Sequence, residues 1–184
     1  FLAIPSLGCI NVHASLLPKL RGASPVNRAL MRGETKTGVT VQYVAEKVDR
    51  GDVILPVEQD ILPEDNAGTL SARLSRLGAD ALVRALRVVE SGKAPRVPQD
   101  ESEATFAPKL KKQDCLIDFS KSAVEIHNLV RGVTPYPGAF TYFNGRMLKV
   151  LSTEPAADLK ADGKYGTISS VTKGKGWNVV TGGG

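Results

Sequence analysis

Cysteine and histidine are both scarce in this sequence of 184 residues. The two cysteines, Cys9 and Cys115, lie far apart, and neither has a second cysteine or a histidine at the spacing of metal ligands. A disulfide framework and a zinc site therefore have no support, and we expect two free thiols and no bound metal.

Long hydrophobic runs are also missing. No apolar run approaches the roughly 20 residues that a membrane-spanning helix needs. The first residues, Phe-Leu-Ala-Ile-Pro, carry no basic leader of the secretory kind. We therefore expect a cytoplasmic protein that does not bind a membrane. Strand-like residues 8–12 follow the beginning at once, and strand-like residues 177–180 precede the final glycines. This pattern predicts that both ends cut through folded structure.

The composition is otherwise that of a soluble globular protein. Hydrophobic residues make up 42% and charged residues 23% of the chain, so a core can be buried. The length suits one ordinary domain of about 100 to 150 residues plus a small second one, so two domains are expected. The net charge of +5 favours polyanionic partners, although such an excess is common in proteins that never bind nucleic acid.

The first half of the chain alternates strand and helix patterns. Ser24 and Pro25 begin, and Gly33 ends, a short expected helix over 25–32 with Val26, Ala29 and Leu30 inward. Residues 37–44 and 53–55 have the β-branched composition of strands. This alternation predicts an α/β fold with a mainly parallel sheet.

A long amphipathic helix follows these strands. Thr69 can cap it and Gly92 can end it. Its apolar residues recur at three- and four-residue intervals, which predicts that they face the core; they are Leu70, Leu74, Leu77, Ala81, Leu82, Leu86 and Val89.

The rear of the chain has a different pattern. Residues 96–114 have the Pro, Glu, Gln and Lys composition of a linker, so we divide the chain into domains over 1–95 and 115–184. Ser122 and Glu125 form a capping box that opens a helix ending near Gly132. The dipeptide Asn144-Gly145 between two strand-like runs predicts a hairpin with a type I′ turn. With further strand-like runs at 167–171 and 177–181, we expect a small β-rich domain, arranged as a barrel.

Two polar residues stand at the end of the first expected strand. Alternation along a strand points Asn11 and His13 to the same side, and the carboxyl ends of strands are where functional groups gather in α/β sheets. A histidine in this place is by itself more often structural. The apolar loop 14–22 directly after it suits a flat ligand, and Asp49, in the loop after the next strand, could reach the same edge.

The run NVHASLLPKLRGASPVNRAL, followed by GETKTGVT and VDRGD, resembles the signature of the folate-dependent formyltransferases. The resemblance implies a Rossmann-like catalytic domain and 10-formyltetrahydrofolate as the formyl donor. The family's catalytic residues fall on Asn11, His13 and Asp49, and its folate-contacting loop falls on Ser15, Leu16, Leu17 and Pro18.

The rear segment ATFAPKLKKQDCLIDFSKSAVEIHNLVRGVTPYPGAF is similar to the family members that formylate methionyl-tRNA. It implies initiator methionyl-tRNA as the partner, a role in translation initiation, an oligonucleotide-binding (OB)-like second domain and a monomer. The family's front half and the end of this barrel are absent, so we expect residues 1–184 alone to be inactive. A family member that acts on UDP-linked aminoarabinose has a similar second domain and is the closest alternative.

Several assignments remain open on the sequence alone. Asp52 is the alternative to Asp49, although its place directly before a strand favours a structural role. Arg21 could contact a phosphate or hold its loop. Lys109, Lys111 and Lys112 could be a solvated linker or could bind the tRNA backbone, while we interpret His127 as structural or solvent-facing.

Two other functions are also possible. A formyltransferase acting on a nucleotide-linked amino sugar would keep Asn11, His13 and Asp49 and would not need tRNA. A non-catalytic RNA-binding module would leave these three residues unexplained.

Overall fold

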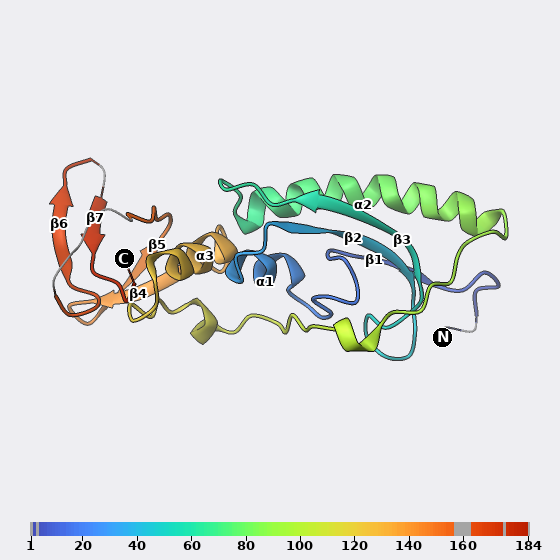
Figure 1. Ribbon diagram of the computed structural model, residues 1–184, viewed down its shortest axis with the longest axis horizontal. Helices are drawn as coiled ribbons and strands as arrows, with labels where there is room; N and C mark the ends of the chain where they lie inside the picture. The colour runs from blue at the N-terminus through green and yellow to red at the C-terminus, as the bar shows by residue number, and fades with distance from the viewer. Residues whose placement is uncertain (1, 3, 157–162, 175, 184) are drawn as a thin grey trace.

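The molecule is elongated, with two parts placed one after the other along its long axis (Figure 1). The computed structural model describes residues 2, 4–156, 163–174 and 176–183. The first part is a sheet covered by one long helix, and the second is a helix with two hairpins. In the described part of the chain, no helix combines the length and the apolar character needed to cross a membrane. The elements are β1 (Ile10–His13), α1 (Pro25–Met31), β2 (Lys36–Tyr43), β3 (Val53–Asp60), α2 (Ala67–Glu90), η1 (Glu101–Glu103), η2 (Lys112–Cys115), α3 (Ala123–Val133), β4 (Ala139–Phe143), β5 (Arg146–Val150), β6 (Ile168–Thr172) and β7 (Gly176–Val179).

The sheet of the first part is antiparallel, so the prediction of a mainly parallel sheet was wrong for the described strands. The strand order is β1-β2-β3, and each strand runs opposite to its neighbour. The connection between Tyr43 and Val53 is shorter than the dozen or more residues that a parallel crossover needs, so it joins β2 and β3 as a hairpin with a long loop. The Rossmann-like arrangement stays a prediction.

Helix α2 covers one face of this sheet. Its cap is Asn66, whose side chain accepts hydrogen bonds from the backbone of Gly68 and Thr69. The prediction that Thr69 is the cap was therefore wrong, and Thr69 instead completes a capping box. Leu86 was also expected to face inward but is 48% exposed, because Ala85 takes the inward position in the four-residue spacing from Ala81 to Val89. The residues of α2 that are buried against the sheet and α1 are Ala67, Leu70, Leu74, Gly78, Ala81, Ala85 and Val89.

Helix α1 matches its prediction, since Val26, Ala29 and Leu30 are buried and Gly33 has a positive φ of 71°. Ser24 occupies the N-cap position but makes no side-chain capping bond. The helix lies between the sheet and the second part of the molecule (Figure 1).

The two faces of the sheet differ in character. In the register of β1 and β2, Asn11 lies opposite Gln42 and His13 lies opposite Thr40. Residues opposite each other in an antiparallel pair share a face, so these four polar side chains lie on one face. The alternate residues Val39 and Val41 are buried in the hydrophobic core, which α2 covers. The sheet thus has an apolar face beneath α2 and a polar face on its other side.

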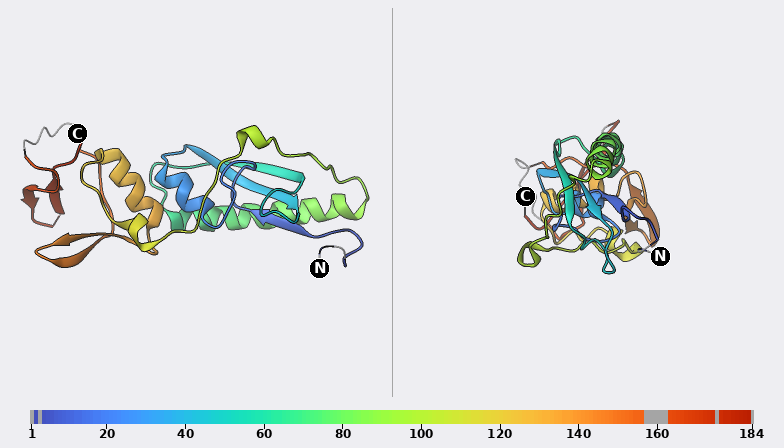
Figure 2. Two further views of the ribbon diagram at one scale, coloured as in Figure 1. Left: turned by 90° about the horizontal axis from the view of Figure 1, so that it is seen from below. Right: turned by 90° about the vertical axis from the view of Figure 1, so that its right-hand side faces the viewer.

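The expected linker is not a free connection. It runs along the side of the sheet away from α2, as Figures 1 and 2 show. Val97 and Val53 exchange two backbone hydrogen bonds of 2.8 and 3.1 Å. Further along, the backbone amide of Arg21 donates to Thr105 at 2.9 Å and that of Ala107 donates to Arg21 at 2.7 Å. We call residues 94–107 the returning segment, because these bonds fasten it to the first part.

The second part begins as predicted. Ser122 and Glu125 form the capping box of α3, which ends at Val133, one residue beyond the expected Gly132. Asn144 and Gly145 have φ of 48° and 74° and join β4 to β5, which confirms the hairpin. Strands β6 and β7 form a second hairpin. Among the described residues each hairpin is a separate two-stranded sheet, so the OB-like barrel stays a prediction.

The two parts meet through α1 and α3. The Asn27 side-chain amide donates to the carbonyl of Gly132 at 2.8 Å, and the Arg28 guanidinium pairs with Asp114 at 2.7 Å. A Cβ at Gly132 would lie only 2.6 Å from Met31, so the glycine lets the helices approach. This contact fixes the second part against the first.

Candidate functional site

The polar face of the sheet holds the first two predicted site residues. His13 is buried, while Asn11, two residues earlier on the same face, is exposed. Their partners on β2, Thr40 and Gln42, are almost fully buried. The sequence interpretation missed Thr40 and Gln42, although their alternation with Val39 and Val41 in a strand could have revealed them.

His13 and Asp49 come together from different elements. The Nδ1 atom of His13 lies 3.6 Å from Oδ1 of Asp49. The Nε2 atom lies 2.9 Å from the carbonyl oxygen of Leu20. Because a carbonyl can only accept, Nε2 must carry a hydrogen. The ring is therefore held between a backbone carbonyl and a carboxylate, and the carboxylate can stabilise a positive charge on it.

The loop 44–52 presents the Asp49 carboxylate to this face. Asp49 has a left-handed φ of 55°, which is uncommon for residues other than glycine. Its Oδ2 accepts from the backbone amide of Gly22 at 2.8 Å, and its Oδ1 accepts from the Gln42 side-chain amide at 3.3 Å. The carboxylate is only 11% exposed and is oriented by groups from two other segments.

Asp52 takes the structural place expected for it. Its side chain is 38% exposed and lies 4.0 Å from the Arg96 guanidinium. Its carbonyl accepts from the backbone amide of Tyr43 at 2.9 Å. Asp49, and not Asp52, is the carboxylate beside His13.

The loop 15–18 is held against the same sheet. The Thr40 hydroxyl donates to the carbonyl of Ser15 at 2.7 Å and accepts from the amide of Leu17 at 3.0 Å. The Ser15 hydroxyl donates to the carbonyl of Lys19 at 2.5 Å, so it is used within the loop. Leu16, Leu17 and Pro18 are half-buried, and they form an apolar border beside the polar residues.

Arg21 is part of an internal network and is 2% exposed. Its guanidinium donates to Oε1 of Gln99 at 2.8 and 3.1 Å and to both carboxylate oxygens of Glu101 at 2.9 and 3.0 Å. The hydrogen bonds from Arg21 lower the pKa of the Glu101 carboxyl, which keeps Glu101 charged as a partner. This arrangement matches the loop-holding role of Arg21 rather than a phosphate contact.

The remaining predicted residues belong to the entry of the second part. Lys109, Lys111 and Lys112 are exposed, and the Lys112 ammonium lies 5.8 Å from the centre of the Phe140 ring. Their exposure is compatible with both a solvated segment and a tRNA contact. His127 is half-buried and its Nδ1 lies 2.9 Å from the carbonyl oxygen of Thr153, a structural place of the kind expected.

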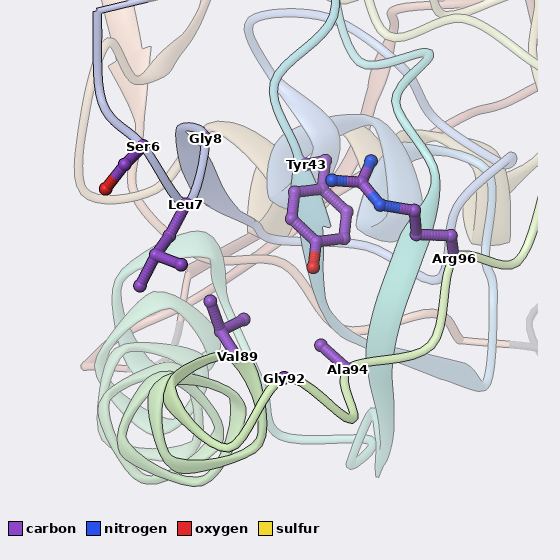
Figure 3. Close-up of a pocket in the computed structure, with 8 residues that line it drawn as sticks. All are labelled: Ser6, Leu7, Gly8, Tyr43, Val89, Gly92, Ala94 and Arg96. Carbon is purple, nitrogen blue, oxygen red and sulfur yellow. The ribbon is translucent and has the colours of Figure 1, made fainter.

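Two further features of the described residues bear on possible ligands. No group of three or more His, Cys, Asp or Glu residues in the described part of the chain could hold a metal ion. A shallow hollow of about 290 Å³ lies between the start of β1, the end of α2 and the returning segment. In it the Arg96 guanidinium stacks 3.7 Å above the Tyr43 ring (Figure 3). None of the predicted site residues lines this hollow.

Comparison with known proteins defines the class of this chain. Residues 1–86 match the formyl transferase family model, and residues 109–184 match the model of the formyl transferase C-terminal domain. The chain therefore belongs to the formyl transferase family. The gap between the two matches, 87–108, contains the whole of the returning segment.

Two similar curated relatives are both methionyl-tRNA formyltransferases. The methionyl-tRNA formyltransferase of Syntrophus aciditrophicus is 47% identical over 183 residues, which are 100% of this chain and 58% of that protein. The methionyl-tRNA formyltransferase of Clostridioides difficile is 49% identical over 172 residues, 94% of this chain and 55% of that protein. The chain spans a little over half the length of these relatives.

Solved structures agree on the fold. HypX from Aquifex aeolicus, in complex with tetrahydrofolic acid, matches with a TM-score of 0.72 at 21% identity, covering 94% of this chain and 30% of that one. The N-formyltransferase from Helicobacter canadensis, in complex with folinic acid and dTDP-3-aminofucose, matches with a TM-score of 0.73 at 18% identity, covering 94% and 65%. At these identities the likeness shows the formyltransferase fold alone.

Proposed function

We propose that the complete protein transfers a formyl group from 10-formyltetrahydrofolate to the free amine of initiator methionyl-tRNA. The observation that carries the proposal is the pairing of His13 with Asp49 on the polar face that also bears Asn11. The relatives named methionyl-tRNA formyltransferase, at 47% and 49% identity, support this acceptor over others.

The chemistry of formyl transfer requires groups of this kind. A neutral amine attacks the formyl carbon, and negative charge develops on the formyl oxygen in the tetrahedral intermediate. Asn11 is exposed and has an amide that can donate to this oxygen. His13 stabilises the charge and passes the proton that the amine loses to the folate nitrogen, and Asp49 orients His13 and balances its charge. The bond between the formyl carbon and this nitrogen then breaks, which releases tetrahydrofolate and leaves the formyl group on the amine.

The loop 15–18 supports binding of a flat formyl donor. Thr40 ties this loop to the sheet through two hydrogen bonds, so the apolar border is already in place beside Asn11 and His13. Sites for flat ligands combine such apolar walls with a few polar groups. Two structural neighbours are described as complexes with tetrahydrofolic acid or folinic acid, which favours a folate donor here.

The acceptor is the point to test, because the Helicobacter canadensis neighbour is described with dTDP-3-aminofucose. The complete protein should be given 10-formyltetrahydrofolate with methionyl-tRNA, and in parallel with a nucleotide-linked amino sugar. We expect formyl-methionyl-tRNA and no formylated sugar. Formylation of the sugar alone would contradict the proposal and identify a sugar formyltransferase. Binding of tRNA without formyl transfer to either acceptor would favour the non-catalytic RNA-binding module.

The exposed lysines at the entry of the second part lead to a separate prediction. If Lys109, Lys111 and Lys112 contact tRNA phosphates, changing all three to alanine should weaken tRNA binding and flatten its salt dependence. Each lost contact should remove roughly one unit from the slope of log K against log salt concentration. Filter binding at several salt concentrations measures this slope.

A control with the same loss of charge is available on the first part. Lys36, Arg84 and Lys93 are exposed cations on β2, on α2 and in the segment just after α2, and their triple alanine variant should keep the slope nearly unchanged. An unchanged slope in the variant of Lys109, Lys111 and Lys112 would mean that these lysines are solvated and do not contact tRNA.

A further inference from the structure

We propose that Gln99, on the returning segment, is a positioning residue that holds Asp49 beside His13. This inference rests on the proposed function of that pair. Gln99 lies outside both family matches, 1–86 and 109–184. Its side chain nevertheless contacts the loop 44–52, although Gln99 and Asp49 are 50 residues apart in the sequence.

The first contact is to the backbone of the loop. The Gln99 amide nitrogen donates to the carbonyl of Asp49 at 2.9 Å and to that of Gly51 at 2.8 Å. Asp49 has the left-handed backbone that side chains disfavour. Fastening the carbonyls of Asp49 and Gly51 holds the loop in this conformation, which sets the direction in which the Asp49 carboxylate points.

The second contact reaches the carboxylate through Gln42. The Gln42 carbonyl oxygen Oε1 lies 3.2 Å from the Gln99 amide nitrogen, the longest of the three contacts of this nitrogen, and shares one of its two hydrogens with a loop carbonyl. The Gln42 amide nitrogen in turn lies 3.3 Å from Oδ1 of Asp49. Gln99 therefore acts on Asp49 at two places, its main-chain carbonyl and, through Gln42, the oxygen that faces His13. Gln42 comes from β2, so the relay connects the sheet to the loop.

The orientation of the Gln99 amide follows from its partners. Arg21 can only donate, so the atom facing its guanidinium must be the oxygen of Gln99. The carbonyls of Asp49 and Gly51 can only accept, so the atom facing them must be the nitrogen. Two charged donors on the oxygen also polarise the amide and strengthen its N–H groups as donors. Rotating the amide would place acceptors against acceptors, so one arrangement is strongly favoured.

The support of Gln99 is itself fixed. Arg21 is buried and makes a bidentate pair with Glu101, two residues after Gln99. The returning segment is fastened to Val53 before Gln99 and to Arg21 after it. Gln99 is thus held on both sides, and it can restrain the loop 44–52, in which Glu46, Lys47 and Val48 are exposed.

The test uses the complete protein with Gln99→Ala and Gln99→Glu. We expect kcat to fall by about 10- to 100-fold, since a displacement of about 1 Å in a catalytic group can cost on the order of 10²-fold. The KM values for both substrates should stay within about twofold, because the change acts on the reacting geometry. Gln99→Glu keeps the length but presents an acceptor to two carbonyls, so its loss should be at least as large. Gln59→Ala is the matched control, because the Gln59 amide contacts only the neighbouring Asp60 carbonyl among its described hydrogen bonds.

Two readouts separate positioning from general destabilisation. In the Asp49→Asn background, adding Gln99→Ala should lower kcat by less than about twofold, because residues that act through one another are not additive. Hydrogen exchange of residues 46–52 should become faster in Gln99→Ala and not in Gln59→Ala. The unfolding temperature of the protein should stay nearly unchanged in both variants.

Unchanged exchange in this loop, or a full additional loss on top of Asp49→Asn, would overturn the inference. Failure of the wild-type protein to formylate methionyl-tRNA would instead remove the proposed function. The exchange measurement would still decide whether Gln99 holds the loop.

Discussion

Alanine in place of Asn11, His13 or Asp49 should lower kcat for formyl transfer by roughly 10²-fold or more in the complete protein, a typical loss for a transition-state donor or a proton-transfer group. Affinity for tRNA should change little, since the three residues are proposed to act on the reacting formyl group and not on tRNA phosphates. Single-turnover kinetics with 10-formyltetrahydrofolate, together with tRNA binding, measures both quantities.

The three substitutions differ in what else they disturb. Asn11 is exposed, so Asn11→Ala should leave the unfolding temperature unchanged and reports on chemistry alone. Asp49→Ala also places alanine at a φ of 55°, so Asp49→Asn is the cleaner variant, because asparagine tolerates this backbone and loses only the charge. His127→Ala is the control histidine and should keep wild-type turnover. Wild-type turnover in a variant of Asn11, His13 or Asp49 would remove that residue from the mechanism.

Gly51→Ala should destabilise the protein by about 3 kcal/mol, the upper end of what overpacking costs, and should abolish most activity. A Cβ at Gly51 would lie 1.7 Å from the carbonyl oxygen of Tyr43 and 2.7 Å from its carbonyl carbon. Both atoms are backbone of β2, so no side chain can move aside. The loop would have to shift and would carry Asp49 away from His13. Thermal unfolding and the formyl-transfer assay test the two effects together.

Gly92→Ala is the comparison for this prediction. Gly92 has a φ of 69°, and a Cβ there would meet no atom within 4 Å, so the substitution isolates the conformational cost of about 1 kcal/mol. Gly51→Ala should exceed it clearly. Equal effects would mean that the loop accommodates a methyl group and is less tightly held than its hydrogen bonds indicate.

Hydrophobic periodicity predicted the helices and the hairpin well, but not the direction of the strands. Period-2 alternation and β-branched residues are the same in parallel and antiparallel strands. The length of the connection between β2 and β3 carried the missing information, because a parallel crossover needs more chain. The cap of α2 was misassigned for a similar reason, since Asn66 and Thr69 are both good capping residues and only their mutual hydrogen bonds decide between them.

The candidate site was predictable to the extent that it is local. Asn11 and His13 share a face through strand alternation, and the resemblance to the formyltransferases brought Asp49 to them. Gln99 could not be found in this way, because its segment has the composition of a linker and its role arises only where that segment folds back. Contacts between residues far apart in sequence leave no periodic trace in either segment.

The returning segment has a consequence for exchanging domains between relatives. A chimaera joined directly after residue 86 would take its catalytic part from one parent and residues 87–108 from the other. Arg21, from the first parent, would then meet foreign residues at the positions of Gln99 and Glu101. A junction placed after Ala107 would keep these partners from a single parent, so the position of the crossover, rather than the identity of the second domain, would decide whether the hybrid is active.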